Sequence, residues 1–250
     1  MKRILNLDGA INLRELGGYI TTDGKQIKYN KLLRSGDISN LTPQALNYLK
    51  KYGLKYVVDF RGDREQQVWA DKNTDFYQIY SDPVYPLMGN GDKLASAYSN
   101  TNSYLGMIYQ SVLLDKYGQR AYALLFELLL ENNQENKSLL FHCAAGKDRT
   151  GMAAILILKA LGVGDETIAR DYLLTNLMYS DSDTIEKTLN DKDGNQNINK
   201  MNMTKADLES ITSVFDAIKH YYGSFENYLA QALHFDKNKL NQLKNIYLEN

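Results

Sequence analysis

One stretch of this sequence determines where its chemistry can lie: residues 139–151 read LLFHCAAGKDRTG. It begins with a short apolar run of the kind that forms a buried strand, and apolar residues at helical spacing follow from Met152 to Leu161. Cys143 therefore falls in a loop between a strand and a helix. Five residues separate Cys143 from Arg149, so the loop can curl until its backbone N–H groups point inward and bind an anion.

The residue types in this loop suit a phosphate ligand. Gly146 can adopt the positive φ that a tight concave loop requires, and the small side chains of Ala144 and Ala145 leave the backbone open. Arg149 carries a planar, always charged guanidinium that can hold two phosphoryl oxygens at once. We therefore predict that this loop binds a phosphate group.

Cys143 is the predicted nucleophile. A helix N-terminus and the neighbouring Arg149 stabilise a thiolate, which is the reactive form of cysteine. The Thr150 hydroxyl is predicted to donate to the sulfur and to stabilise it as a leaving group when a phospho-cysteine is hydrolysed. The alternative is a small buried hydrophobe, which is the usual role of a lone Cys after an apolar run. A catalytic role for Cys143 is favoured because the same stretch also contains His142, Gly146, Arg149 and Thr150.

The string HCAAGKDRTG resembles the signature loop of the protein tyrosine phosphatase superfamily. Its Lys147-Asp148 pair is similar to the bacterial branch of broad-specificity enzymes, which also act on phosphoserine, phosphothreonine and phosphoinositides. A second block, residues 12–19 (NLRELGGY) followed by residues 33–36 (LRSG), resembles the N-terminal block of the same enzymes. The resemblance implies an α/β fold with a short mixed central sheet flanked by helices, and a phosphorylated protein or phosphoinositide as substrate.

The composition limits which kinds of protein and of binding site remain possible. With 250 residues, 3 Pro and no low-complexity linker, we expect one domain spanning residues 1–250. A net charge of −1 gives no basic field for nucleic acid, and a single Cys excludes an internal disulfide or a CxxC metal or redox site. We expect no metal and no cofactor.

The apolar stretches fall short of the ~20 residues of a membrane span. Without an export signal we expect a cytoplasmic protein, or a secreted one if a signal peptide has been removed.

A second site candidate follows the apolar run at residues 56–60. Ligands in open α/β sheets collect beyond the carboxyl ends of strands, so Asp59 and Arg61 would lie beside the Cys143 loop if the two strands are neighbours. The alternative for Asp59 is a helix cap. We interpret Arg64 and Glu65 as a surface salt bridge.

The N-terminal block contributes two more basic residues, Arg14 and Arg34. They either approach the site or brace the fold, and we slightly favour surface pairing, the commoner fate of an Arg.

The general acid has two candidates. Many tyrosine phosphatases supply it from a Trp-Pro-Asp loop, but the one Trp of this chain, Trp69, is followed by Ala70-Asp71. The resemblance favours Asp148, whereas the strand end favours Asp59.

Lys147 also allows two interpretations. It either contacts a second phosphate of an inositol headgroup or only raises the local potential for any phosphate. Phosphoinositide phosphatases of the superfamily add another Lys directly after the Cys, where this chain has Ala144.

Other features are assigned more simply. We expect a helix from Thr42-Pro43 to Gly53, and two helices between residues 104 and 131 with a break at Gly118. Residues 88–102 form either a lid or, as the default, a surface loop. Residues 191–195 fail the calcium-loop pattern and indicate a turn.

Two rival functions remain: sulfur transfer of the rhodanese type, and a phosphate-binding module without turnover.

Overall fold

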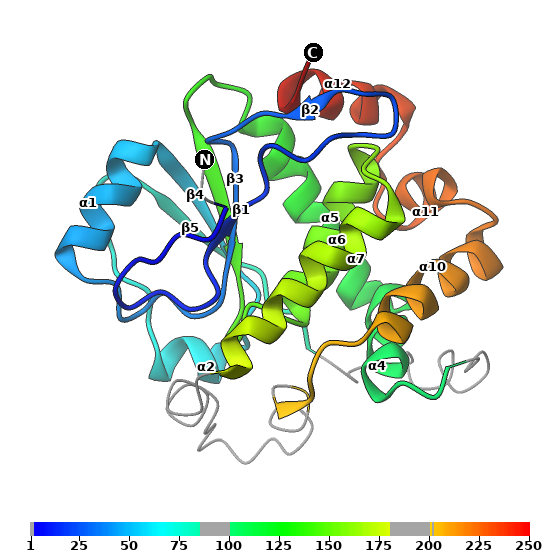
Figure 1. Cartoon of the computed structure of the whole chain (residues 1–250), viewed down its shortest axis with the longest axis horizontal. Coiled ribbons are helices and arrows are strands. Elements are labelled where there is room, and N and C mark those ends of the chain that lie inside the picture. The colour runs from blue at the N-terminus through cyan, green and yellow to red at the C-terminus, as the bar shows by residue number, and fades with distance from the viewer. Residues whose placement is uncertain (1–2, 86–100, 181–200, 202) are drawn as a thin grey trace.

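The computed structural model describes residues 3–85, 101–180, 201 and 203–250 (Figure 1). In chain order, its elements are β1 (Arg14–Glu15), β2 (Gln26–Ile27), β3 (Leu32–Ser35), α1 (Pro43–Tyr52), β4 (Leu54–Asp59), α2 (Asp63–Val68), β5 (Gln78–Ser81), α4 (Tyr104–Leu114), α5 (Lys116–Glu131), β6 (Ser138–His142), α6 (Arg149–Ala160), α7 (Asp165–Leu173), the 3₁₀ helix η1 (Leu174–Ser180), α10 (Leu208–Tyr222), α11 (Phe225–Ala232), α12 (Lys237–Tyr247) and β7 (Leu248–Glu249). The expected α/β class is confirmed.

The central sheet has five strands in the order β1-β3-β6-β4-β5. Strands β3, β6, β4 and β5 run parallel, and β1 pairs antiparallel with β3 at one edge, so the sheet is mixed as predicted. Every residue of β6 is buried, in keeping with a central parallel strand covered on both faces. The strand that delivers Cys143 is therefore the middle of the sheet.

Alternation along β6 assigns its side chains to two cores. Leu139 and Phe141 lie in a large core that also includes residues of α4, α5 and α6, whereas Leu140 lies in a smaller core that includes residues of α1. Figure 1 shows α1 on one side of the sheet and α5 and α6 on the other. Cys143 continues the alternation and belongs to the large core. Its side chain is thereby directed to the face covered by α5 and α6.

The observed ends of three helices can be compared with the predicted ones. Helix α1 begins after Thr42, whose hydroxyl accepts the N–H of Ala45, and ends at Gly53 in the left-handed conformation, as predicted. The predicted break at Gly118 between these two helices is wrong. The break between α4 and α5 falls at Asp115, whose carboxylate accepts the N–H of Tyr117 and caps α5. Gly118 lies inside α5.

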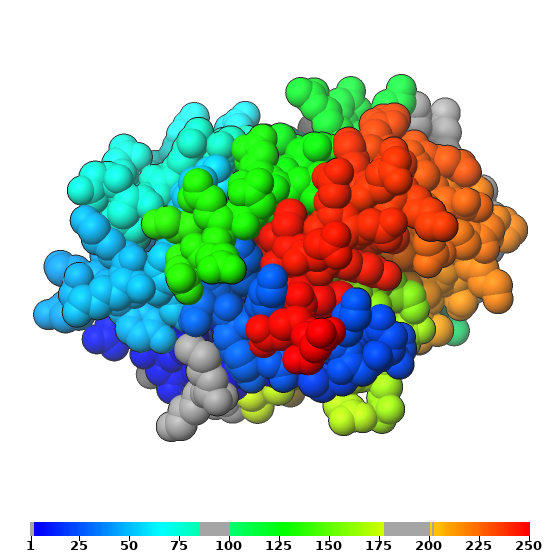
Figure 2. Space-filling model, turned by 90° about the horizontal axis from the view of Figure 1, so that it is seen from above, coloured from blue at the N-terminus to red at the C-terminus, as the bar shows by residue number. Residues whose placement is uncertain are grey.

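The C-terminal end of the chain pairs with β2 in a second, two-stranded sheet. Strand β2 pairs antiparallel with the C-terminal β7, and Figure 2 shows the C-terminal segment in red beside the blue N-terminal stretch. A turn at Asp23-Gly24, closed by the Thr21 N–H to Lys25 C=O bond of 2.8 Å, leads into β2. Residues 88–100 and 191–195 lie outside the described residues. In the described part, no helix has the length and hydropathy to cross a membrane.

Candidate active site

The loop after β6 is shaped by two glycines. Gly146 has φ +67°, the left-handed region in which a side chain is strained, as the sequence predicts. A Cβ on Gly146 would lie 2.4 Å from the backbone nitrogen of Gly36, and one on Gly36 would lie 2.7 Å from the carbonyl oxygen of Ala144. The end of β3 and the Cys143 loop therefore touch through bare backbone. This close approach holds the loop in its curl.

The carbonyl groups of the loop are held away from its concave side. The N–H of Asp37 donates to the carbonyl of Ala144 at 2.7 Å, and the side-chain amide of Asn12 donates to those of Ala145 and Gly146 at 3.3 and 3.1 Å. In a trans peptide the next N–H points opposite to the carbonyl. The following N–H groups are thereby directed into the loop, the arrangement that binds an anion.

Arg14 and Arg34 brace this loop from behind. Arg34 donates to the carbonyl of Gly146 at 2.9 Å and pairs with Asp171 at 2.6 Å, while Arg14 pairs with the other oxygen of Asp171 at 3.2 Å. All three side chains are buried, so the favoured surface pairing is wrong. Burial alone would raise the pKa of Asp171, but the two guanidinium groups lower it to about 2. The Arg residues of the N-terminal block therefore form an internal ion-pair cluster.

Asp171→Asn is expected to lower the free energy of unfolding at neutral pH by about 3–5 kcal/mol, because it leaves two buried guanidinium groups uncompensated. Asp165→Asn is the matched control, since its pair with Lys159 is partly exposed and worth less than about 1 kcal/mol. Denaturant titration measures both. The Asp171 contribution is present above the ordinary carboxylate pKa and is lost as pH falls toward about 2. Similar small losses in both variants would contradict the bracing role.

Arg149 is oriented by Glu65, the third residue of α2. Its Nη1 and Nη2 donate to the two carboxylate oxygens at 2.6 and 2.8 Å, and Nη1 also donates to the carbonyl of Phe60 at 3.3 Å. Glu65 is buried, so its assignment to a surface salt bridge is wrong. Within the described residues, these contacts use three of the five N–H donors of Arg149 and leave Nε–H and one Nη2–H. The remaining pair has the geometry of a second fork that could donate to two oxygens of an anion.

The charges of this pair are strongly stabilised. Burial alone would raise the pKa of Glu65, but Arg149 lowers it below its ordinary value. Burial alone would lower the pKa of Arg149, but Glu65 raises it. The two groups therefore stay ionised together. On the backbone side, the Tyr122 hydroxyl donates to the carbonyl of Arg149 at 3.1 Å and fixes the first residue of α6.

Thr150 does not make the predicted contact with the sulfur. Its hydroxyl donates to the carbonyl of Ser35 at 3.3 Å, at the end of β3. The reason is the close approach of β3 to the loop, which offers a backbone acceptor. Thr150 thus ties the start of α6 to the neighbouring strand.

Asp148 is a buried residue of the Cys143 loop. The Tyr109 hydroxyl donates to its Oδ1 at 2.6 Å, and the Lys147 amine lies 3.5 Å from the same oxygen. Burial raises the pKa of Asp148 above its ordinary value, and the Lys147 charge and the Tyr109 hydrogen bond oppose that rise. A carboxyl group with a raised pKa can carry a proton nearer to neutral pH, which is what a general acid requires.

Lys147 does not face a second phosphate. Its side chain is fully buried, and its Nζ donates to the backbone carbonyls of Met201 and Thr204. This position disfavours the interpretation in which Lys147 contacts an inositol headgroup, because the amine is directed to the backbone before α10. Lys147 joins the nucleophile loop to that segment.

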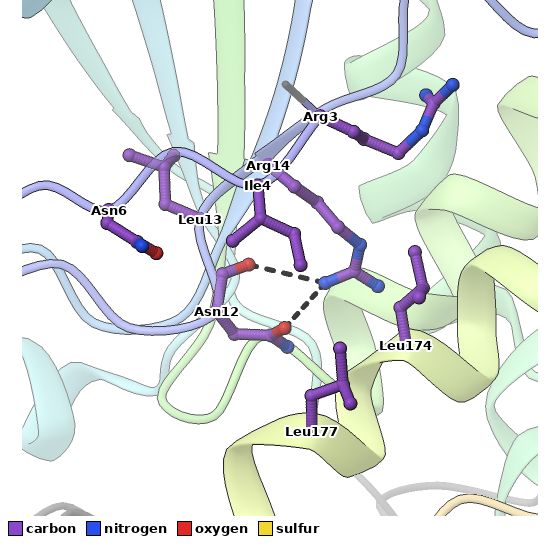
Figure 3. Close-up of a pocket in the computed structure, with 8 residues that line it drawn as sticks. All are labelled: Arg3, Ile4, Asn6, Asn12, Leu13, Arg14, Leu174 and Leu177. Atoms are coloured by element: carbon purple, nitrogen blue, oxygen red, sulfur yellow. Dashed lines mark hydrogen bonds between the residues drawn. The ribbon is translucent and has the colours of Figure 1, made fainter.

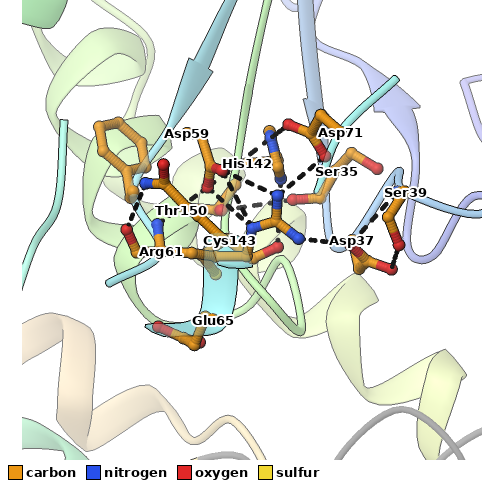
Figure 4. A network of polar contacts seen from close by, with 12 residues as sticks. Ser35, Asp37, Ser39, Asp59, Arg61, Glu65, Asp71, His142, Cys143 and Thr150 are labelled. Carbon is orange, nitrogen blue, oxygen red and sulfur yellow. Dashed lines mark hydrogen bonds and ion pairs between the residues drawn. The ribbon is translucent and has the colours of Figure 1, made fainter. Parts of the chain in front are cut away.

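The second site candidate forms a network behind Cys143 (Figure 4). Strands β4 and β6 are neighbours and Asp59 pairs with His142 in register, so the predicted proximity is confirmed. Arg61 donates to Asp59 at 2.8 Å, Asp37 at 2.6 Å and Asp71 at 2.8 Å. Three carboxylates engage the guanidinium of the buried Arg61, which disfavours it as a substrate-binding residue. The same contacts occupy both oxygens of Asp59 and disfavour it as the general acid.

Three members of this network have the residue types of a metal site. Ligand atoms of Asp59, Asp71 and His142 lie within 4.8 Å of one another. However, Arg61 forms ion pairs with both carboxylates. Burial alone would lower the pKa of His142, but Asp59 and Asp71 raise it to about 9, so the imidazole is protonated near neutral pH and a cation would have to displace that proton. The cluster is an ion-pair network that supports the loop.

A cavity of about 720 Å³ lies on the outer side of the loop (Figure 3). It is lined by Arg3, Ile4, Asn6, Asn12, Leu13, Arg14, Leu174 and Leu177. Arg14 donates to the backbone carbonyl and the side-chain oxygen of Asn12 at 3.3 and 2.6 Å, which fixes the amide that holds the loop carbonyls. The wall of this cavity is therefore part of the support of the loop, and Cys143 is not among its lining residues.

The strand-loop-helix unit around Cys143 was predicted from the sequence, whereas several residues that support its loop were not. Cys143, Asp148 and Arg149 were placed on one such unit, and the structure has them there. No role was assigned to Asn12, Asp37, Tyr109 or Asp171. Only the role of Glu65 could have been inferred from the sequence. The guanidinium of Arg149 needs a carboxylate to hold it rigidly, and Glu65 follows β4, the strand beside β6.

Comparisons with known proteins extend this likeness along the chain. A family model described as the tyrosine phosphatase family matches residues 5–249. A Cupriavidus necator protein named as a tyrosine-protein phosphatase is 31% identical over 250 residues, which cover 98% of this chain and 88% of that protein. The triple specificity protein phosphatase PtpB of Mycobacterium tuberculosis is 28% identical over 200 residues, which cover 69% of each chain. The similarity thus extends far beyond the Cys143 loop.

Proposed function

Because this chain belongs to the tyrosine phosphatase family, we propose that it hydrolyses phosphate monoesters through a phospho-cysteine intermediate on Cys143. The observation that carries the proposal is the loop between Cys143 and Arg149, whose carbonyls are bonded outward and whose Arg is held by a buried Glu65. Such a cradle matches the three non-bridging oxygens of a phosphoryl group.

In the first step, the Cys143 thiolate attacks phosphorus in line with the leaving oxygen. The S–P bond forms, the P–O bond to the alcohol or phenol breaks, and the Asp148 carboxyl gives its proton to the departing oxygen. The loop N–H groups and the second fork of Arg149 hold the equatorial oxygens, where charge is redistributed in the transition state.

In the second step, water attacks the phosphorus of the phospho-cysteine. The Asp148 carboxylate accepts a proton from this water, the S–P bond breaks, and the thiolate returns with release of inorganic phosphate. The helix N-terminus at α6 and the charge of Arg149 support the thiolate as the leaving group. The proton balance closes, because Asp148 regains the proton that it gave in the first step.

The substrate class is proposed from the site and from the relatives. Phosphotyrosine is the principal candidate. Phosphoserine and phosphothreonine are included because a relative is named a triple specificity protein phosphatase. Phosphoinositides remain a lower-ranked alternative, since the buried amine of Lys147 supplies no contact for a second phosphate.

The test is release of inorganic phosphate from p-nitrophenyl phosphate, followed by peptides carrying phosphotyrosine, phosphoserine or phosphothreonine, and by phosphoinositide vesicles. We expect turnover of p-nitrophenyl phosphate and the highest kcat/KM on phosphotyrosine. Binding of phosphate without release of nitrophenol would indicate a binding module instead. Activity confined to thiosulfate would indicate a sulfurtransferase.

A further inference from the structure

A chain of side-chain hydrogen bonds runs from Asp148 through Tyr109 to Tyr172. The Tyr109 hydroxyl on α4 lies 2.6 Å from Asp148 Oδ1 and 2.7 Å from the Tyr172 hydroxyl on α7. Ser210, at the start of α10, is an electrostatic neighbour of Tyr172, and its own hydroxyl donates to Asp207 Oδ2 at 2.9 Å. Helices α4 and α7 therefore contribute one hydroxyl each to a hydrogen-bonded path that ends on the Asp148 carboxylate.

Burial shows that the hydroxyl groups of this chain need an explanation. Tyr109, Tyr172 and Ser210 are fully buried, and the two rings meet edge to face at 6.2 Å. Phenylalanine would fill the same space without the cost of removing a hydroxyl from water, so the packing alone does not require tyrosine. What the hydroxyls add is a set of directed bonds that converge on one carboxyl oxygen.

The contacts of Asp148 differ between its two oxygens. In the described part of the chain, Tyr109 and the Lys147 amine both approach Oδ1, at 2.6 and 3.5 Å. Oδ2 is thus the oxygen left to carry the transferable proton. A carboxyl group that is anchored through one oxygen keeps the other at a fixed position, which is the geometry that proton transfer to a leaving group needs.

We propose that Tyr109 and Tyr172 are positioning residues for the general acid: Tyr109 anchors Asp148 through Oδ1, and Tyr172 anchors Tyr109. This proposal rests on the proposed phosphatase function. The Tyr109 hydroxyl can donate to Oδ1 both when Asp148 is ionised and when it carries a proton on Oδ2, and the Tyr172 hydroxyl can donate to Tyr109 in both states. The buried acid therefore keeps a partner throughout the catalytic cycle.

The proposal predicts a change in proton transfer as well as in rate. Several ionisable groups face Asp148: from its own loop Lys147 and Arg149, from α4 Tyr104 and Tyr109, and from α7 Tyr172. Of these, the Tyr109 hydrogen bond stabilises the ionised carboxylate, so its loss raises the pKa of Asp148 further. The general acid must be protonated to act, so the alkaline limb of the kcat/KM profile should move to higher pH in Tyr109→Phe.

The experiment compares Tyr109→Phe and Tyr172→Phe on an activated and a poor leaving group, with Tyr228→Phe as the matched control. Tyr228 is equally buried and donates its hydroxyl to the carbonyl of Leu113 at 3.2 Å, outside the chain of hydroxyls. We expect Tyr109→Phe to lose about 10-fold or more in kcat/KM on an alkyl phosphate and much less on p-nitrophenyl phosphate. Tyr172→Phe should show a smaller loss with the same leaving-group dependence.

The outcomes separate this proposal from the function on which it rests. A wild-type protein without phosphatase activity overturns both. An active wild type, with Tyr109→Phe and Tyr172→Phe that keep the wild-type leaving-group dependence and alkaline limb, overturns the positioning role alone. Equal losses on both substrates that Tyr228→Phe reproduces indicate a role in folding and also overturn it. If Tyr109→Phe does not fold, Tyr172→Phe decides, because it removes the next hydroxyl and leaves the Asp148 contact in place.

Discussion

Replacement of Cys143 by Ser is expected to abolish turnover, by a factor on the order of 10⁴ or more, while phosphate and vanadate still bind. A serine hydroxyl stays protonated near neutral pH and is a poor nucleophile without an adjacent base. The cradle itself is unchanged, because the outward carbonyl bonds and the Arg149–Glu65 pair do not involve the sulfur. Steady-state kinetics and titration calorimetry with each oxyanion measure the two properties.

Oxyanion binding is also the control for this variant. A Ser protein that binds vanadate with wild-type affinity has a folded loop, so its lost turnover is due to the missing thiolate. A Ser variant with near-parental kcat would show that another group attacks phosphorus.

Asp148→Asn is expected to lower kcat/KM by about 10²–10⁴-fold on an alkyl phosphate and much less on an activated aryl phosphate. The loss depends on the leaving group because a good one departs without a proton. Asp59→Asn is the matched comparison: Asp59 lies at the end of the neighbouring strand, but its oxygens accept hydrogen bonds from Arg61. Its loss should be similar on both substrates. A leaving-group dependence seen only in Asp59→Asn would exchange the two roles.

The pH profile provides an independent check of the same assignment. Burial raises the pKa of Asp148, so the carboxyl remains protonated to a higher pH than an exposed aspartate. Activity should fall as pH rises through this pKa, and the fall should be absent in Asp148→Asn. An alkaline limb that persists unchanged in the Asn variant would have to come from another group.

The features predicted correctly from sequence are those encoded locally. The apolar run before Cys143 and the helical spacing after Arg149 lie within one stretch of chain, so the strand-loop-helix unit could be identified directly. The position of Asp59 beside His142 followed from one further rule, that parallel strands end at the same edge of a sheet. Both inferences depend on short-range pattern and regular geometry.

The supports of the loop could not be predicted because their partners are distant in sequence. Arg14 and Asp171 are separated by 157 positions, and Arg149 and Glu65 by 84. No local sequence pattern predicts such a pair, and a charged residue is generally expected to be exposed on the surface. The charged side chains of these two pairs are buried because each contacts an opposite charge. Lys147 shows the same limit: its acceptors are backbone carbonyls, which every residue offers.

Rapid mixing with p-nitrophenyl phosphate, acid quench and mass spectrometry of the digested protein tests the central claim most directly. The mechanism predicts one phosphoryl group on the peptide that contains Cys143, formed before the steady state and absent from Cys143→Ser. The label should disappear when substrate is exhausted, because water hydrolyses the intermediate. A phosphoryl group trapped on a different residue, or an unlabelled Cys143 during full turnover that the Ser variant retains, would contradict catalysis through a phospho-cysteine.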